Sequence, residues 1–271
     1  MPFSYTTIKV TRSRIDKGLL AIPVSLIDLF PKTNGDVYLL DANGQWVRTT
    51  FTAYNSSSKE CRIGGMRDFY DKYHIEGGDE LVLHVHGDNR YQIVPEKLFR
   101  HEVRKLESRL DKAPTLMEAD AVLTALAGLT NTRAEDVIKS EYARLASRTV
   151  PHRKVKTRRD AKIREHIPPS LRKMLTSLYH GRCQVSGFSF LKKTGGPYFE
   201  VHHIDALKGN HVKNVLVVSP NVHAQFTHAA VKQSFDQFGW LRQVRLNDDS
   251  YTVFQVVDEL TTVHKKEIHS M

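Results

Sequence analysis

The stretch EVHHIDALKGNHVKNVLVVSPNVHAQFTHA, from Glu200 to Ala229, determines the fold and chemistry expected of the C-terminal part of this chain. Its five histidines are His202, His203, His211, His223 and His228. Imidazole is a common ligand of borderline divalent metals, and its pKa also suits proton transfer near neutral pH. Single histidines are usually ordinary surface residues, but a pair followed by spaced partners favours a metal site. Adjacent strand residues point to opposite sides, so one of His202 and His203 can hold a metal while the other works elsewhere.

Three segments of this region resemble the HNH motif of the ββα-metal endonucleases. They read YHGRCQVSGF (179–188), EVHHIDAL (200–207) and NVLVVSPNVHAQFTH (214–228). The resemblance covers roughly residues 175–230 and keeps the order of the motif: a His-His pair on a strand, a central Asn, and a later His on a helix opening near Pro220. It implies a metal-dependent nuclease domain.

The resemblance implies a role for each matching residue. His203 would be the general base that activates a water, and His202 would bind a divalent ion beside it. Asn214 would hold the loop and orient His203 through hydrogen bonds, as supporting residues do around metal sites. His223 would be a further metal ligand. Such a set supplies the base and the cation that phosphodiester hydrolysis requires.

The last metal ligand is the least defined part of the motif. In many members it lies four residues after the third histidine, where this chain has Thr227. His228 follows directly and is the remaining candidate. His211 has no counterpart in the motif, so we expect it at the surface. The ligands admit magnesium, manganese, nickel or zinc, with phosphate oxygens completing the coordination shell.

Many members also carry a structural zinc held by two Cys-x-x-Cys pairs. The corresponding segments here are Cys183-Gln-Val-Ser186 and Ser219-Pro-Asn-Val222, so cysteine occupies one position of four. We expect no structural zinc, and Cys183 should be a small buried hydrophobe. The other cysteine, Cys61, is distant in sequence, which argues against a disulfide framework and favours a cytoplasmic location.

The first 98 residues have the pattern of a strand-rich domain. β-rich or alternating segments, separated by turn residues, occur at 5–10, 36–41, 46–54, 80–85 and 91–94. Short helices are expected at Pro23–Phe30 and Met66–Tyr73. Together these segments predict a barrel-like β domain.

Apolar spacing changes to that of helices after residue 96 and predicts two or three helices up to residue 148. The basic stretch PHRKVKTRRDAKIREH (151–166) follows, and is either a solvated linker or a phosphate-contacting segment. A helix at Pro169–Tyr179 and strands near Tyr251–Val257 complete the chain. The expected fold is therefore α+β, with a recognition domain (1–98), a helical connector with a basic linker (99–166) and a nuclease domain (167–271).

Segments of the first domain resemble the DNA-binding pseudobarrel of plant transcription factors, which is also the recognition domain of some restriction endonucleases. They read LLAIPVSLIDLF (19–30), DVYLLDANGQWVRTTF (36–51) and GGMRDFYDKYHIEGGDELVLHV (64–85). In that family two arms enter the major groove, and the matching segments are Thr11–Leu20 and Asn55–Arg67. The resemblance implies that these arms contact bases or phosphates. The candidate DNA-binding residues are Arg12, Arg14, Lys17, Asn55, Ser57, Lys59, Arg62 and Arg67.

The charge of the chain agrees with a polyanionic partner. Forty Lys and Arg against 30 Asp and Glu give a net charge of +10, and no apolar run approaches 18 residues. We therefore expect no membrane association. We expect the protein to be a restriction endonuclease that cuts double-stranded DNA. It should act as a homodimer, with the helices of 96–148 as the candidate interface. The alternatives are a modification-dependent endonuclease that senses methylated cytosine and a DNA-binding regulator with an inactive nuclease domain.

Overall fold

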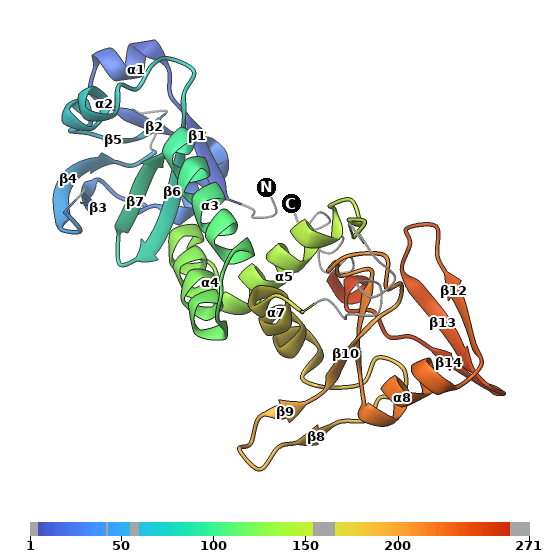
Figure 1. Ribbon diagram of the computed structural model, residues 1–271. Coiled ribbons are helices and arrows are strands. Elements are labelled where there is room, and N and C mark those ends of the chain that lie inside the picture. The colour runs from blue at the N-terminus through green and yellow to red at the C-terminus, as the bar shows by residue number, and fades with distance from the viewer. Residues whose placement is uncertain (1–4, 42, 55–59, 154–165, 261–271) are drawn as a thin grey trace. The chain divides into compact units, whose positions relative to one another are not determined.

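The computed structural model describes residues 5–41, 43–54, 60–153 and 166–260 of the chain (Figure 1). The fold is mixed α and β, as expected. Two compact units divide the chain: one holds 4–106 and 129–131, and the other holds 107–128 and the residues from 132 onward. The helices that follow residue 98 are thus shared between the two units.

The N-terminal unit is built on a seven-stranded sheet that is nearly closed and barrel-like (Figure 1). Its strand order is β1-β6-β7-β3-β4-β5-β2, and every neighbouring pair is antiparallel except β3 with β7. The strands are β1 (Thr6–Lys9), β2 (Leu20–Ile22), β3 (Gly35–Leu40), β4 (Trp46–Thr52), β5 (Cys61–Ile63), β6 (Glu80–Gly87) and β7 (Arg90–Pro95). The strands predicted from alternation are all present.

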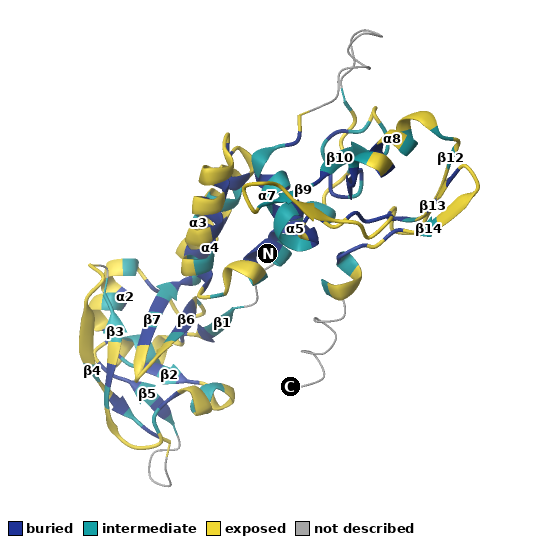
Figure 2. Cartoon of the chain, turned by 90° about the horizontal axis from the view of Figure 1, so that it is seen from below, coloured by how far each residue is buried: buried dark blue, intermediate teal, exposed yellow. Residues whose placement is uncertain are grey.

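One hydrophobic core fills this sheet, because the inward residues of its strands are apolar. Val37, Ile63 and Leu81 are completely buried at its centre, and Figure 2 shows buried residues along β6 and β7. The short helices are α1 (Arg12–Asp16), η1 (Val24–Leu29) and α2 (Arg67–Tyr73). The last two confirm the helices predicted at Pro23–Phe30 and Met66–Tyr73, the first of them as a 3₁₀ helix.

His84 on β6 is buried in this unit beside the ring of Phe99, at 5.8 Å between centroids. Its Nε2 has no hydrogen-bond partner among the described residues. Burial lowers the pKa of His84, and the nearby His86 lowers it further. The folded state therefore resists protonation that the unfolded state accepts.

This burial makes the stability of the unit sensitive to acid. The pKa of His84 is lower in the folded state than in the unfolded state. Keeping His84 unprotonated therefore costs no stability at a pH above the unfolded-state pKa, and the cost grows as the pH falls below that pKa. Between pH ~6.5 and pH ~5.5 the loss should reach at most about 1.4 kcal/mol. Urea unfolding of His84→Leu should show a weaker loss toward acid pH than wild type. His101→Leu, which changes an exposed histidine, should follow wild type; equal slopes for all three would contradict this account.

Helices form the first part of the second unit and lead into its sheets. They are α3 (Glu96–Asp111), which begins in the N-terminal unit, α4 (Leu116–Thr130), α5 (Ala134–Ala146) and α7 (Pro169–Tyr179). Three helices between residues 96 and 148 confirm the predicted number, and α7 has the predicted bounds. No helix among the described residues is long and apolar enough to cross a membrane.

Short antiparallel strands and one helix complete the C-terminal unit. They are β8 (Phe190–Leu191), β9 (Pro197–Tyr198), β10 (Glu200–His203), β11 (Val215–Val218), α8 (Pro220–His228), β12 (Val231–Phe235), β13 (Leu241–Leu246) and β14 (Asp249–Thr252). The strand predicted up to Val257 ends at Thr252 instead. Beyond that point the chain leaves the ladder, because Gln184 bonds to Phe254 through both its backbone carbonyl and its side-chain amide.

Candidate functional site

The histidine segment folds as two antiparallel strands followed by a helix. In the β10–β11 hairpin, His202 lies opposite Leu216 and His203 opposite Val215. Helix α8 begins at Pro220, where the side chain of Ser219 caps it by accepting a hydrogen bond from the backbone N–H of Val222. The helix predicted near Pro220 is thus confirmed, and it packs against β10.

His202 and His223 meet between β10 and α8. Their rings approach edge to face with 5.5 Å between centroids. The ring of His202 also stacks on Phe226 of α8, with centroids 4.1 Å apart. This stacking holds the ring of His202 in one orientation. The two imidazoles that the sequence assigned to a metal therefore lie side by side, as their 5.5 Å separation shows.

Glu200, which sequence reasoning missed, supports this pair. Residues two apart on a strand share a face, so Glu200 lies on the same side of β10 as His202. Nδ1 of His223 donates to the carboxylate of Glu200, and the hydroxyl of Tyr198 donates to the other carboxylate oxygen at 3.2 Å. A carboxylate that holds one ring nitrogen fixes the tautomer and leaves the other nitrogen, here Nε2, for a metal. The strand alternation could have revealed Glu200.

His203 is held from the opposite side by a residue that the sequence did not suggest. Nε2 of His203 lies 3.0 Å from Oδ1 of Asn210, and the amide nitrogen of Asn210 donates to the carbonyl of His166 at 2.8 Å. Since that carbonyl can only accept, the oxygen end of the Asn210 amide must face His203. Nε2 therefore carries the proton, and Nδ1 of a neutral His203 keeps the lone pair that a base needs.

Asn214 ties together the loop that joins the two strands. Its amide nitrogen donates to the carbonyls of Asp205, Lys208 and Gly209 at 3.0–3.1 Å, and its oxygen accepts from the backbone N–H of Asp205 at 3.0 Å. Asn214 is buried and holds the loop as expected. The hydrogen bond to His203 that we expected of Asn214 is made by Asn210.

Removing the Asn214 side chain should destabilise the C-terminal unit. Asn214→Ala deletes four hydrogen bonds and leaves buried backbone groups unpaired, which should cost about 2–4 kcal/mol. Chemical unfolding followed by tryptophan fluorescence measures this through Trp240 of the same unit. Asn221→Ala, at an exposed asparagine of α8, is the matched control and should change stability little. Equal stabilities for the two variants would contradict the role given to Asn214.

The remaining histidines of the segment have other surroundings. His228 is exposed at the last position of α8. His211, which we expected at the surface, is buried; that expectation was wrong. Its Nε2 contacts the carbonyl of Arg148 at 3.1 Å, and its Nδ1 accepts from the backbone N–H of Lys213 at 3.1 Å. Burial lowers the pKa of His211, which suits this neutral, structural role.

The donors present fit a divalent ion only in part. In the described residues no group of three or more His, Cys, Asp or Glu side chains is arranged to hold a metal. His202 and His223 are two adjacent imidazoles, and the second is already supported by Glu200. The chemistry of the pair suits a borderline metal, but the remaining ligands would have to be oxygens of water or of a phosphate.

Cys183 lies where the zinc-binding members of the resembling family have their first cysteine. It is buried with Val218 and Val222 in a hydrophobic cluster that continues into β13. Burial opposes ionisation of Cys183, but hydrogen bonds from Ser186 and neighbouring backbone groups outweigh it and lower the pKa. Cys183 is thus the buried small residue that we expected.

The described parts of the two predicted DNA-binding arms lie next to each other in the N-terminal unit. Strands β2 and β5 pair so that Arg62 lies opposite Ala21, and the backbone N–H of Met66 donates to the carbonyl of Gly18. A side chain at Gly18 would collide with Arg67, because an added Cβ would lie 2.6 Å from its Cγ. The sequence-predicted residues Asn55, Ser57 and Lys59 lie outside the described residues.

The described arm residues differ in how they are engaged. Arg12 forms an exposed ion pair with Asp16 at 3.2 Å, and Lys17 is exposed. Arg14 instead pairs with Glu60 of the second arm, and it is only about a quarter exposed. Because an exposed pair of this kind holds its partners weakly, Arg12 is free to exchange its carboxylate for a phosphate.

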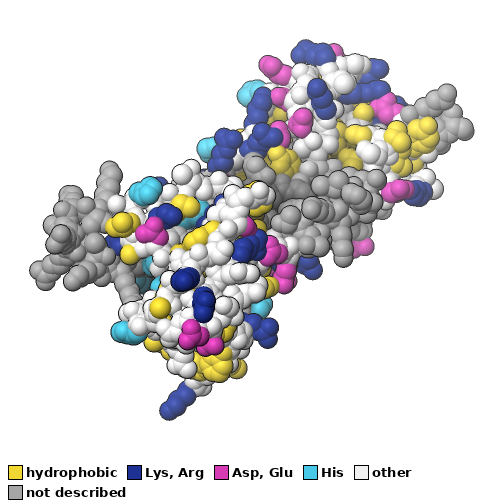
Figure 3. All heavy atoms as spheres, turned by 90° about the vertical axis from the view of Figure 1, so that its right-hand side faces the viewer, with side chains coloured by type: hydrophobic (Ala, Val, Ile, Leu, Met, Phe, Trp, Pro, Cys, Tyr) yellow, Lys and Arg dark blue, Asp and Glu magenta, His cyan; other side chains and the backbone are white. Residues whose placement is uncertain are grey.

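Both described ends of the basic stretch lie against the loop that follows β10. Arg153 donates from its backbone to the carbonyl of Leu207 at 2.9 Å and from its side chain to that of Ala206 at 3.1 Å. At the other end, His166 holds Asn210. Residues 154–165 lie outside the described residues. On the face in Figure 3, Lys and Arg are spread among acidic side chains rather than gathered in one patch.

Comparison with known proteins adds a distant likeness among solved structures. No family model and no curated protein matches the chain. Among solved structures, the Arabidopsis FUS3–DNA complex is similar to 34% of this chain and 94% of its own, with 15% sequence identity and a TM-score of 0.29.

Proposed function

We propose that this protein is a metal-dependent endonuclease that cuts double-stranded DNA. The observation that carries the proposal is that the adjacent histidines of β10 lie on opposite sides of the strand and make different contacts. His202 and His223 meet on the side of β10 that faces α8, whereas the neighbouring His203 is held by Asn210 with its Nδ1 available. Two metal donors and one base thus come from the same short hairpin and helix.

Each residue has a role that its contacts support. His202 and His223 would hold a divalent ion, which would stabilise the negative charge that develops on the phosphate. His203 would take a proton from the attacking water through Nδ1. Asn210 keeps the proton of His203 on the other nitrogen, and Asn214 keeps the loop in the shape that this requires. His228, the least defined candidate, can be tested directly: His228→Ala should lower activity only if its imidazole joins the ion.

The barrel-like sheet would supply recognition. Its two arms lie together and carry Arg12, Lys17, Arg62 and Arg67, whose side chains suit phosphates and guanine edges. One active site cuts one strand, so a restriction enzyme with a symmetric target would act as a homodimer, with the helices of 96–148 as the candidate interface. Light scattering of the protein with and without DNA tests the dimer; a monomer in both conditions would remove it.

Two alternatives share the same architecture. A modification-dependent endonuclease would cut only DNA with methylated cytosine, and a regulator with an inactive nuclease domain would bind DNA without cutting it. The ordered contacts of His203 and His223 favour an active centre over a decayed one.

One digestion experiment separates these functions. Genomic DNAs of known sequence, with and without cytosine methylation, are incubated with the protein and magnesium, manganese or nickel. Discrete fragments from unmethylated DNA support a restriction enzyme, and fragments from methylated DNA alone support the modification-dependent alternative. If the protein binds DNA but leaves it intact in every mixture, only the DNA-binding regulator remains consistent with the result.

A further inference from the structure

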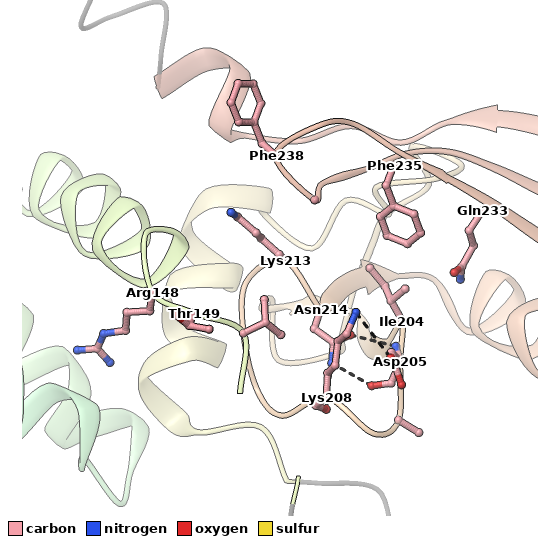
Figure 4. Close-up of a pocket in the computed structure, with 13 residues that line it drawn as sticks. Arg148, Thr149, Ile204, Asp205, Lys208, Lys213, Asn214, Gln233, Phe235 and Phe238 are labelled. Carbon is pink, nitrogen blue, oxygen red and sulfur yellow. Dashed lines mark hydrogen bonds and ion pairs between the residues drawn. The ribbon is translucent and has the colours of Figure 1, made fainter. Parts of the chain in front are cut away.

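A cavity of about 740 Å³ lies beside the loop that joins β10 to β11. Its volume falls in the range of small-ligand sites, roughly 300–1,000 Å³. Ile204 and Asn214 form its floor, Lys208 and Lys213 lie along the loop side, and Phe235 stands over it from β12 (Figure 4). We call this space the Phe235 pocket. Ile204, one of its lining residues, directly follows His203 in the chain.

Phe235 lies at an irregularity in the pairing of β12 with β13. Ser234 pairs with Gln243 but Phe235 pairs with Leu241, so β13 advances by two residues where β12 advances by one. Bulges often redirect a side chain beside an active site. Figure 4 shows the ring of Phe235 directed toward Ile204 and Asn214, yet 48% of the residue is exposed. A large aromatic ring is therefore left partly open above Ile204 and Asn214.

Lys213 supplies a positive charge that no acidic side chain of the described residues neutralises. Lys208 is paired with Asp205 at 3.7 Å, and Arg148 is paired with Asp111 at 2.7 Å. Lys213 has no carboxylate partner among the described residues, and its ammonium lies over the ring of Trp240 at 5.7 Å from the centroid. The pocket thus combines an open aromatic ring with an unpaired cation.

Gln233 adds a group that can both donate and accept hydrogen bonds. It lines the same pocket as Phe235 and is exposed. A primary amide beside an aromatic ring can pair with the edge of a base while the ring stacks on its face. An aromatic face, an amide and a cation are together the groups that bind one nucleotide of a single strand.

We propose that the Phe235 pocket binds an unpaired nucleotide of the DNA strand next to the cutting site. The base stacks on Phe235 with its edge toward Gln233, and the phosphate lies near Lys213. This inference rests on the proposed function for its biological setting. It goes beyond that function in assigning a site that takes a nucleotide out of the duplex.

Binding without cleavage tests the pocket. Two fluorescein-labelled probes are compared in the presence of a chelator: a blunt duplex, and the same duplex with a short single-stranded overhang. The full-length wild-type protein should bind the overhang probe more tightly. Phe235→Ala should weaken binding of the overhang probe by about five-fold or more, because one stacked base contributes at least that much, and should leave the blunt duplex nearly unchanged. Phe235→Trp should retain the preference.

Two further variants complete the test. Lys213→Ala should reduce the salt dependence of overhang binding by roughly one phosphate contact. Phe188→Ala removes another exposed phenylalanine of the same unit and should leave binding of both probes unchanged. The proposal is overturned if wild type binds both probes equally, or if Phe235→Ala weakens both by the same factor.

The outcome is independent of catalysis. A preference for the overhang that depends on Phe235, in a protein that leaves DNA uncut with every metal, would support the pocket and refute the proposed function. Cleavage by a protein that shows no such preference would support the proposed function and refute the pocket.

Discussion

His203→Ala is expected to abolish cleavage of DNA while leaving DNA binding intact. A general base typically contributes ~10²–10⁴-fold to the rate, and His203 is the residue to which we assign that role. The arms that we assign to DNA binding belong to the other compact unit, so binding should not depend on this side chain. Single-turnover cleavage and a gel-shift titration of the same protein samples measure the two properties separately.

Two variants make this test specific. His101→Ala changes an exposed histidine of α3 and should cut like wild type. Asn210→Ala keeps His203 but removes its support, so the rate should fall less than in His203→Ala while the affinity for DNA is unchanged. If His203→Ala loses binding together with cleavage, the histidine is structural and its assignment as a base fails.

Arg144→Met is expected to destabilise the C-terminal unit by about 3–5 kcal/mol, the cost typical of leaving a buried charge without its partner. Arg144 lies between Asp111, at 2.8 Å, and Glu141, whose carboxylate accepts at 2.9 Å from Nε. Glu141 is completely buried, and one of its oxygens has no hydrogen-bond partner among the described residues. Burial raises the pKa of Glu141, so its charge depends on Arg144.

Chemical unfolding of paired variants isolates this effect. The double variant Arg144→Met with Glu141→Met should recover much of the lost stability, because a buried ion pair can often be replaced by apolar groups without loss. Arg148→Met removes a half-exposed partner of Asp111 and should cost at most about 1 kcal/mol. Similar losses from Arg144→Met and Arg148→Met would contradict the importance given to burial.

Local sequence patterns predicted the elements of the site well. Alternation placed His202 and His203 on opposite sides of a strand, and Pro220 marked the start of α8. The short helices and strands of the first domain also followed from spacing and turn residues. Each of these features depends on residues that are close together in the chain, which is where periodicity carries information.

Contacts between distant residues could not be predicted in this way. His211 is buried because the carbonyl of Arg148 reaches it, and Asn210 faces His203 because the carbonyl of His166 fixes its amide. The buried charge of Glu141 likewise depends on the position of Asp111 on another helix. No local pattern encodes such pairs, so the motif pointed to His203 as the proposed base and did not reveal its contact with Asn210.

The most direct test of a metal-dependent nuclease centre in the histidine hairpin and α8 is cleavage of supercoiled plasmid across a series of divalent metals. The account predicts nicked and then linear DNA with at least one of magnesium, manganese, nickel or zinc. Cleavage should stop when a chelator is added and resume when the metal is restored. His223→Ala should require far more metal or fail to cut. Plasmid left intact by every metal, or cut equally well in chelator, would contradict the account.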